Sequence, residues 1–128
     1  MDLETFNKFC NSLPATEKVI QWGDSHVWKV GDKIFALSGP WGPDRPDKSF
    51  KIAFKCADMS FKILCDADGI NASPYLGRYK WVLVQDADAL TVSEYEDYIR
   101  HAHALAAAKL TKEAQKELGL TDLVKEVS

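Results

Sequence analysis

The spacing of hydrophobic residues changes along the chain, and these changes predict the elements of the fold. Over residues 2–13 the apolar side chains recur at helical spacing, which predicts an amphipathic helix with Asp2 as its N-cap. Pro14 is expected to end this helix, because the residue before a proline is pushed out of helical geometry. Residues 17–22 then predict a short strand.

A β-ribbon is the next predicted element, and the later strands are expected to extend it. The runs His26–Val30 and Lys33–Leu37 alternate between apolar and polar residues and flank Gly31-Asp32. Glycine accepts the positive φ that a tight hairpin turn requires. We therefore expect an antiparallel hairpin, with Trp22-Gly23 leading into it.

Two further strands are predicted after a long irregular stretch. Residues 50–55 and 79–84 alternate cleanly, which is typical of antiparallel strands with one solvated face. Asp58 is expected to cap a short helix between them, and Gly69 is expected to end it. The intervening residues 70–77 are predicted to form a loop.

The last third of the chain predicts helices. Thr91-Val92-Ser93-Glu94 has the pattern of a capping box, so a long helix is expected to begin there and to run to about Lys109. Thr111 is expected to begin a short helix that ends at Gly119. The fold class predicted from these elements is α+β, a two-layer sandwich whose mostly antiparallel sheet is covered on one face by the N- and C-terminal helices. We expect one domain over residues 1–119 and a C-terminal tail over 120–128.

Composition agrees with a small globular domain. The chain has 128 residues, of which 46% are hydrophobic, and a formal net charge of −3. No apolar run approaches the roughly 20 residues that a membrane helix needs, and the acidic N-terminus lacks an apolar signal region. The sequence therefore predicts a cytoplasmic protein without membrane contact, monomeric by default.

The charge is distributed unevenly, and this suggests a binding surface. Residues 48–84 contain six Lys or Arg but only three Asp or Glu. Lysines in the predicted strands are expected to share the sheet face opposite Trp28, Phe54 and Trp81, with arginines in adjoining loops. Such a surface would suit the phosphate backbone of a nucleic acid, although a solvated face that discourages edge pairing is the simpler alternative. The candidate nucleic-acid-binding residues are Lys29, Arg45, Lys51, Lys55, Arg78 and Lys80.

A second candidate site lies in loops. Residues 38–49 contain three prolines and two glycines, which exclude a helix or a central strand. Trp41 in this loop would either cover apolar surface or form an exposed recognition tip. Together with Tyr75 it is the candidate contact for a ligand or partner protein.

Known catalytic and metal-binding patterns are missing from the sequence. The cysteines Cys10, Cys56 and Cys65 are odd in number and form no Cys-x-x-Cys pair, so reduced thiols are expected. His101 and His103 are two positions apart on a predicted helix and cannot ligate one metal together. The chain has no nucleophile elbow, P-loop or His-Glu-x-x-His motif. We expect no enzymatic role, no metal and no cofactor.

Several segments, taken in order, resemble the MmcQ/YjbR family over about residues 3–118. They are Trp22-Gly23, Val30-Gly31-Asp32-Lys33-Ile34-Phe35-Ala36, Pro74-Tyr75 with Trp81-Val82, and Ala107-Ala108-Lys109-Leu110. The resemblance implies an α+β fold similar to bacterial frataxin, with a double-wing arrangement, and a DNA-binding role proposed by fold analogy. It supplies no catalytic residues. Tyr75-Leu76-Gly77-Arg78 replaces a His-Leu-Asn segment of many members, so no role of that His or Asn transfers.

The resemblance also raises iron binding, because a frataxin-like fold can carry an acidic ridge. Five carboxylates gather near the start of the long predicted helix: Asp86, Asp88, Glu94, Glu96 and Asp97. Stabilisation of the helix N-terminus is the stronger explanation for them. The favoured function is DNA binding by the basic sheet face. The alternative is a non-enzymatic protein-interaction or small-ligand-binding module.

Overall fold

The computed structural model describes residues 1–21, 24–39, 51–73 and 76–125. The candidate residues Trp41, Arg45 and Tyr75, and most of the 38–49 loop, lie outside these ranges. The described helices and strands are α1 (Leu3–Ser12), β1 (Thr16–Gln21), β2 (Ser25–Val30), β3 (Lys33–Gly39), β4 (Lys51–Lys55), α2 (Asp58–Cys65), β5 (Ile70–Ala72), β6 (Trp81–Val84), α3 (Val92–Ala107), α4 (Lys112–Glu117) and α5 (Thr121–Lys125), with 3₁₀ turns η2 (Gly77–Tyr79) and η3 (Ala87–Ala89).

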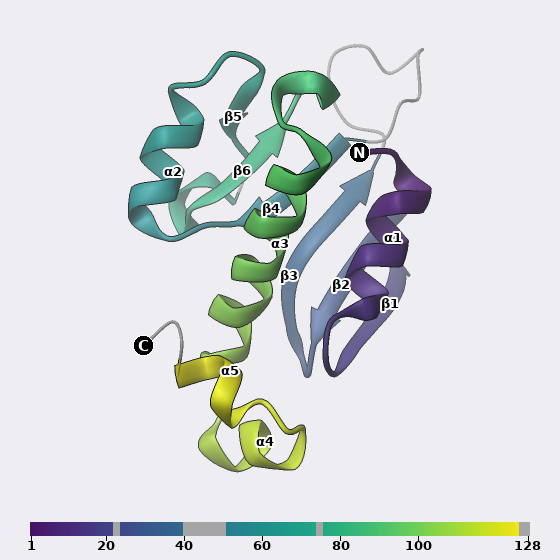
Figure 1. Ribbon diagram of the computed structural model, residues 1–128, viewed down its shortest axis with the longest axis vertical. Coiled ribbons are helices and arrows are strands. Elements are labelled where there is room, and N and C mark those ends of the chain that lie inside the picture. Colours follow the sequence, from purple (N-terminus) through teal and green to yellow (C-terminus); the bar gives the residue numbers. More distant parts are fainter. Residues whose placement is uncertain (22–23, 40–50, 74–75, 126–128) are drawn as a thin grey trace.

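The strands form one six-stranded antiparallel sheet in the order β1-β2-β3-β4-β6-β5. Helices α1 and α3 cover one face of it, and α2 packs beside β5 and β6 (Figure 1). The predicted α+β fold, with a sheet packed against helices, is confirmed. The described part of the chain has no helix that is long and apolar enough to cross a bilayer.

The first helix forms for the reason predicted. The Asp2 carboxylate accepts a hydrogen bond from the Thr5 backbone N–H at 2.8 Å, which satisfies one free donor of the first turn. Leu13 is already extended before Pro14, so the helix ends where the proline requires it. Phe6 and Cys10 form its buried stripe.

The β2–β3 hairpin turns at Gly31, whose φ is +61°. A Cβ at this position would also lie 2.9 Å from a methyl group of Leu110, so only glycine fits without displacing that side chain. The register between the two strands shifts next to Trp28, and Phe35 is the extra residue. This bulge bends β3 and directs both Phe35 and Ala36 into the helix-covered core.

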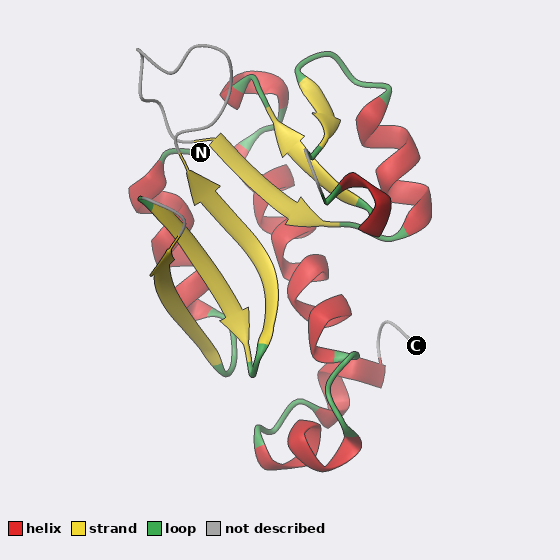
Figure 2. Ribbon diagram, turned by 180° about the vertical axis from the view of Figure 1, so that it is seen from behind, coloured by secondary structure: helices red, strands yellow, loops and turns green. Residues whose placement is uncertain are grey.

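The sheet is divided into two half-sheets, β1-β2-β3 and β4-β6-β5, which are joined over a short distance. Among the described residues, strands β3 and β4 pair only between Ala36–Gly39 and Lys51–Phe54. Beyond these pairs the strands separate, and α3 passes behind the gap (Figure 2). Because α3 packs against both β3 and β4, it holds the half-sheets together where the backbone ladder does not.

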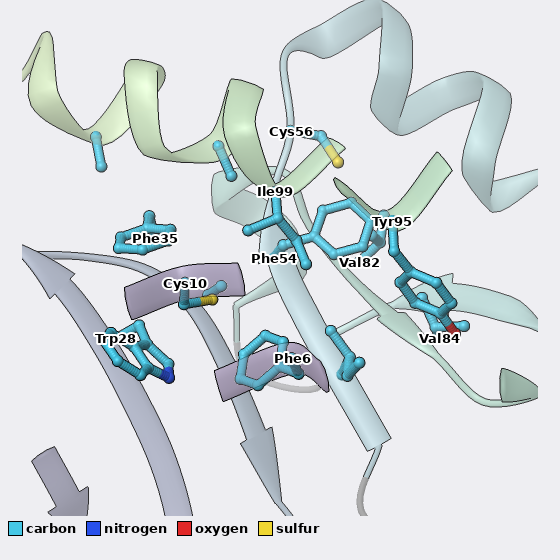
Figure 3. Close-up of a cluster of buried hydrophobic side chains, with 14 of the residues drawn as sticks. Phe6, Cys10, Trp28, Phe35, Phe54, Cys56, Val82, Val84, Tyr95 and Ile99 are labelled. Carbon is cyan, nitrogen blue, oxygen red and sulfur yellow. The ribbon is translucent and has the colours of Figure 1, made fainter. Parts of the chain in front are cut away.

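The main core lies between the helices and the sheet (Figure 3). Its largest fully buried side chains come from α1, β3, β4 and α3, and Phe54 stacks on Tyr98 with ring centroids 5.7 Å apart. Burying aromatic rings removes large apolar areas from water, which is the main driving force for this packing. Phe54 occupies the seam where the half-sheets meet.

A second buried cluster lies on the sheet face away from the helices. It consists of Val27, Leu37, Ala53, Trp81 and Leu83. The expectation that Trp81 faces away from the strand lysines was therefore wrong. Strand β6 begins only at Trp81, and Val82 and Val84 are the residues that enter the helix-covered core. The predicted alternation of Trp81 and Leu83 with Val82 and Val84 holds, but it is the second pair that faces the helices, and the η2 turn excludes Tyr79 from the strand.

The region between β4 and β6 differs from its prediction in two ways. Helix α2 has Ala57 as its N-cap, without a side-chain hydrogen bond, and Asp58 is its first residue. The helix ends at Cys65, and Gly69, at a φ of +84°, instead forms the turn into β5. Strand β5 was predicted as loop because three residues are too few to show alternation.

The C-terminal helices extend the core further than expected. The capping box of α3 is confirmed, since Thr91 and Glu94 each bond the other's backbone N–H. Leu120 is fully buried and α5 follows it, although residues 120–128 were expected to form a tail. The buried leucine anchors this segment beneath α3.

His103 makes the stability of the fold dependent on pH. Its ring is fully buried against Phe35, Nε2 donates to the Pro14 carbonyl oxygen at 2.8 Å, and Nδ1 has no hydrogen-bond partner among the described residues. Burial lowers the pKa of His103 below its usual value. The unfolded chain therefore takes up the proton first as the pH falls below about 6.5, and the free energy of unfolding should decrease there.

Urea unfolding from about pH 7.5 down to about pH 5.5 measures this effect. His103→Gln should flatten the pH dependence, and His101→Gln, at an exposed position of the same helix, is the matched substitution. His26 contributes in the same direction in all three proteins, because burial also lowers its pKa. Equal pH dependence in wild type and His103→Gln would contradict the assignment.

Candidate nucleic-acid interface

Three of the predicted lysines share the sheet face away from the helices. Lys51 and Lys55 alternate with Ile52 and Phe54, which enter the helix-covered core. Lys29 lies between Trp28 and Val30, which do the same. Because side chains alternate along a strand, all three lysines project on the side of the second cluster.

The three lysines have different surroundings. The Lys51 ammonium donates to the Gln85 carbonyl oxygen at 3.2 Å, which fixes the lysine beside the end of β6. Lys29 faces Glu17 across the β1–β2 ladder, and such an opposite charge reduces its attraction for a phosphate. Lys55 lies at the end of β4, where the half-sheets separate.

The remaining described candidates do not lie on this face with the others. Lys80 caps η2 in left-handed geometry, with a φ of +66°. Its ammonium lies 5.1 Å from the ring centre of Phe61, next to α2. Placing Lys80 on the same sheet face as Lys51 was wrong, because the residue precedes the strand. Arg78 lies over the ring of Tyr79 at 4.8 Å, at the edge of the surface.

A groove of about 200 Å³ opens where β3 and β4 separate. We call it the seam groove. Its apolar floor comes from three elements: Ile34 of β3, Trp81 of β6 and Ala106 of α3. Its polar rim consists of Lys33, Lys55, Lys109 and Tyr79.

Positive charges gather in this groove, where the Lys55 ammonium donates a hydrogen bond to the Tyr79 carbonyl oxygen at 3.4 Å. No carboxylate is among the described residues that line it. Burial lowers the pKa of Lys55, and the nearby Lys109 ammonium lowers it further. Two cations held close together in a partly dehydrated groove repel each other, and a bound anion would relieve this repulsion. The electrostatics therefore favour an anionic ligand.

The other candidate chemistries have structural explanations. Burial raises the pKa of Cys56 to about 12 and also raises that of Cys10, so these thiols remain protonated. The carboxylates near α3 bond the backbone: Asp86 accepts from the Asp88 N–H, and Glu94 completes the capping box. Over the described ranges, no group of three or more His, Cys, Asp or Glu residues could hold a metal ion.

The sequence matches the family model of YjbR over residues 11–105, which is most of its length. The chain belongs to the YjbR family. No curated protein matches the sequence. Among solved structures, the YjbR chain is similar to the crystal structure of Deinococcus radiodurans protein DR2400, which has a DUF419 domain. The TM-score is 0.78 at 22% identity, over 93% of this chain and 88% of that chain, and this similarity supports the fold.

Sequence reasoning missed two cations of the YjbR domain's groove, Lys33 and Lys109. Both were present in the segments on which the family resemblance rests, but nothing in their local spacing indicated that they meet. Gly31 packs against Leu110, and this contact brings the β2–β3 turn to the end of α3. A glycine at position 31 was the sequence feature that could have indicated a close contact at this turn. The sequence could not show that Leu110 makes this contact.

Proposed function

We propose that this YjbR-family domain binds DNA through the lysine-bearing face of its sheet. The observation that carries the proposal is the concentration of Lys33, Lys55 and Lys109 at the seam groove, with no carboxylate in its described lining. Lys51 continues the positive charge along β4 on the same face. Lysines arranged in this way attract a phosphate backbone largely independently of base sequence.

The net charge of the chain bears on the strength of this binding. A protein of net charge −3 repels DNA at long range, so attraction must come from a local surface. We therefore expect weak binding that decreases steeply as salt is added, because each phosphate contact releases counterions. A strong salt dependence is the characteristic result of this type of interface.

The test is fluorescence anisotropy with a labelled DNA duplex and with one of its strands, at about 50 mM salt and above. Lys51→Ala/Lys55→Ala should weaken binding and reduce the slope of log affinity against log salt by about 2. The matched control is Lys8→Ala/Lys62→Ala, which removes the same charge from two exposed helical positions. The proposal would be refuted if neither the duplex nor the single strand bound, or if the two double variants bound DNA with equal affinity.

A small anionic ligand is the second candidate, and the seam groove is the feature that favours it. Its volume of about 200 Å³ is below the roughly 300–1,000 Å³ of pockets that bury drug-sized molecules, and its charge is positive. A free ligand of this kind would need Lys55 and Lys109 but not Lys51. Titration with a mononucleotide therefore separates the two candidates.

A further inference from the structure

We propose that the seam groove holds one unpaired nucleotide of a single-stranded nucleic acid, with its phosphate between Lys55 and Lys109 and its base against Trp81 and Tyr79. This inference rests on the proposed function and makes it more specific. It predicts which form of nucleic acid the domain prefers, and it assigns the groove to the base rather than to the backbone alone. The reasons are the charge, the apolar lining and the position of Lys51.

The charge of the groove suits a phosphate at its rim. Lys55 and Lys109 both line the groove, and Lys33 lines it from β3. Burial lowers the pKa of Lys55, and the charge of Lys109 lowers it further. A phosphate between these ammonium groups would compensate them without any rearrangement of the backbone. A neutral ligand would leave the repulsion in place.

The apolar lining suits a base. Trp81 is only 6% exposed, so it forms a fixed floor with Ile34 and Ala106. Tyr79 is 51% exposed and lines the same groove, and the Arg78 guanidinium lies 4.8 Å from its ring centre. Aromatic rings and guanidinium planes are the surfaces on which unpaired bases stack. A phosphate alone would make no use of this floor.

A duplex cannot place a phosphate between the lysines and a base on the apolar floor at the same time. Its bases are paired and stacked inside, and it presents only phosphates and groove edges to a protein. The seam groove has two walls from different half-sheets and a floor from β3, β6 and α3, so it is concave and small. One splayed base can enter such a groove, whereas the convex surface of a duplex stays at its rim.

The position of Lys51 favours a strand over a free nucleotide. Lys51 lies four residues before Lys55 on β4 and on the same face, about 13 Å away along an extended strand. Its ammonium is fixed there by the Gln85 carbonyl oxygen. A second phosphate of the same strand would reach Lys51, whereas a mononucleotide bound at Lys55 would not.

The experiment compares four labelled or competing probes by anisotropy: oligothymidylate, the same backbone with abasic sites, a duplex of equal length, and free thymidine monophosphate. We expect oligothymidylate to bind about tenfold more tightly than either the duplex or the abasic strand. Lys109→Ala should lower the affinity for oligothymidylate about tenfold and the affinity for the duplex much less. Lys8→Ala, at an exposed position on α1, should change neither affinity.

Each other outcome contradicts the inference in a distinct way. Equal binding of strand and duplex, with equal loss in Lys109→Ala, refutes the inference and leaves the proposed function intact. Equal binding of abasic and intact strands shows that no base enters the groove. If thymidine monophosphate binds as tightly as the strand, and Lys51→Ala has no effect, the groove belongs to a free nucleotide. If no DNA probe binds, the proposed function fails as well.

Discussion

Phe54→Ala is expected to lower the free energy of unfolding by about 3–5 kcal/mol, which is a large part of the total stability of a domain of this size. The side chain is fully buried, so the substitution removes apolar contacts and leaves a cavity. The cost is expected to be at the high end because Phe54 pairs with Ala36 at the seam and stacks on Tyr98 of α3. The cavity therefore opens at the seam between the two half-sheets.

Urea unfolding followed by circular dichroism measures this loss. Ile63→Ala is the control, since its side chain on α2 is 60% exposed and its removal should change the free energy of unfolding by at most about 0.5 kcal/mol. Phe54→Leu should lie between the two because it keeps part of the buried volume. A loss in Phe54→Ala no larger than that of the control would contradict the described core.

Leu120→Ala is expected to cost about 2–5 kcal/mol, although only eight residues of the sequence follow it. Leu120 is fully buried in the main core and positions α5 against α3. If residues after Gly119 were an unpacked tail, the substitution would have almost no effect. The measurement therefore decides whether this segment is part of the folded domain.

Leu118→Ala provides the matched control for this prediction. Leu118 is two residues earlier and the same residue type, but it is 40% exposed. We expect it to lose much less stability than Leu120→Ala in the same thermal or urea unfolding experiment. Similar losses in the two variants would show that burial at position 120 does not stabilise the domain.

The fold was predictable where a local rule fixes the backbone. Asp2 and Pro14 bound the first helix, Gly31 forms the hairpin turn, and Thr91 with Glu94 begins α3. Each depends on a hydrogen bond or a dihedral angle within a few residues. Strand β5 and the start of β6 were not predictable, because tertiary pairing and not sequence pattern determines where such short strands begin.

The candidate site was predictable only in part, for a related reason. The faces of Lys51 and Lys55 follow from alternation with Ile52 and Phe54. The groove depends on three features that the alternation of apolar and polar residues does not predict. They are the bulge at Phe35, the short β3–β4 pairing, and the approach of the end of α3 to the gap between the strands. Lys80 was misplaced because it caps the η2 turn in left-handed geometry, immediately before β6 begins at Trp81.

The division of the sheet has a consequence for protein engineering. Residues 1–39 supply Lys33 and Ile34 to the lining of the seam groove, and residues 51–128 supply its other described lining residues. The described chain therefore crosses from one half-sheet to the other once. A cut between Gly39 and Lys51 would therefore yield two fragments, neither of which carries a complete groove. Each fragment could be fused to one half of a split reporter. The reporter would then give a signal for nucleic acid only when the fragments reassemble, so the groove would become a sensor that a single folded chain cannot provide.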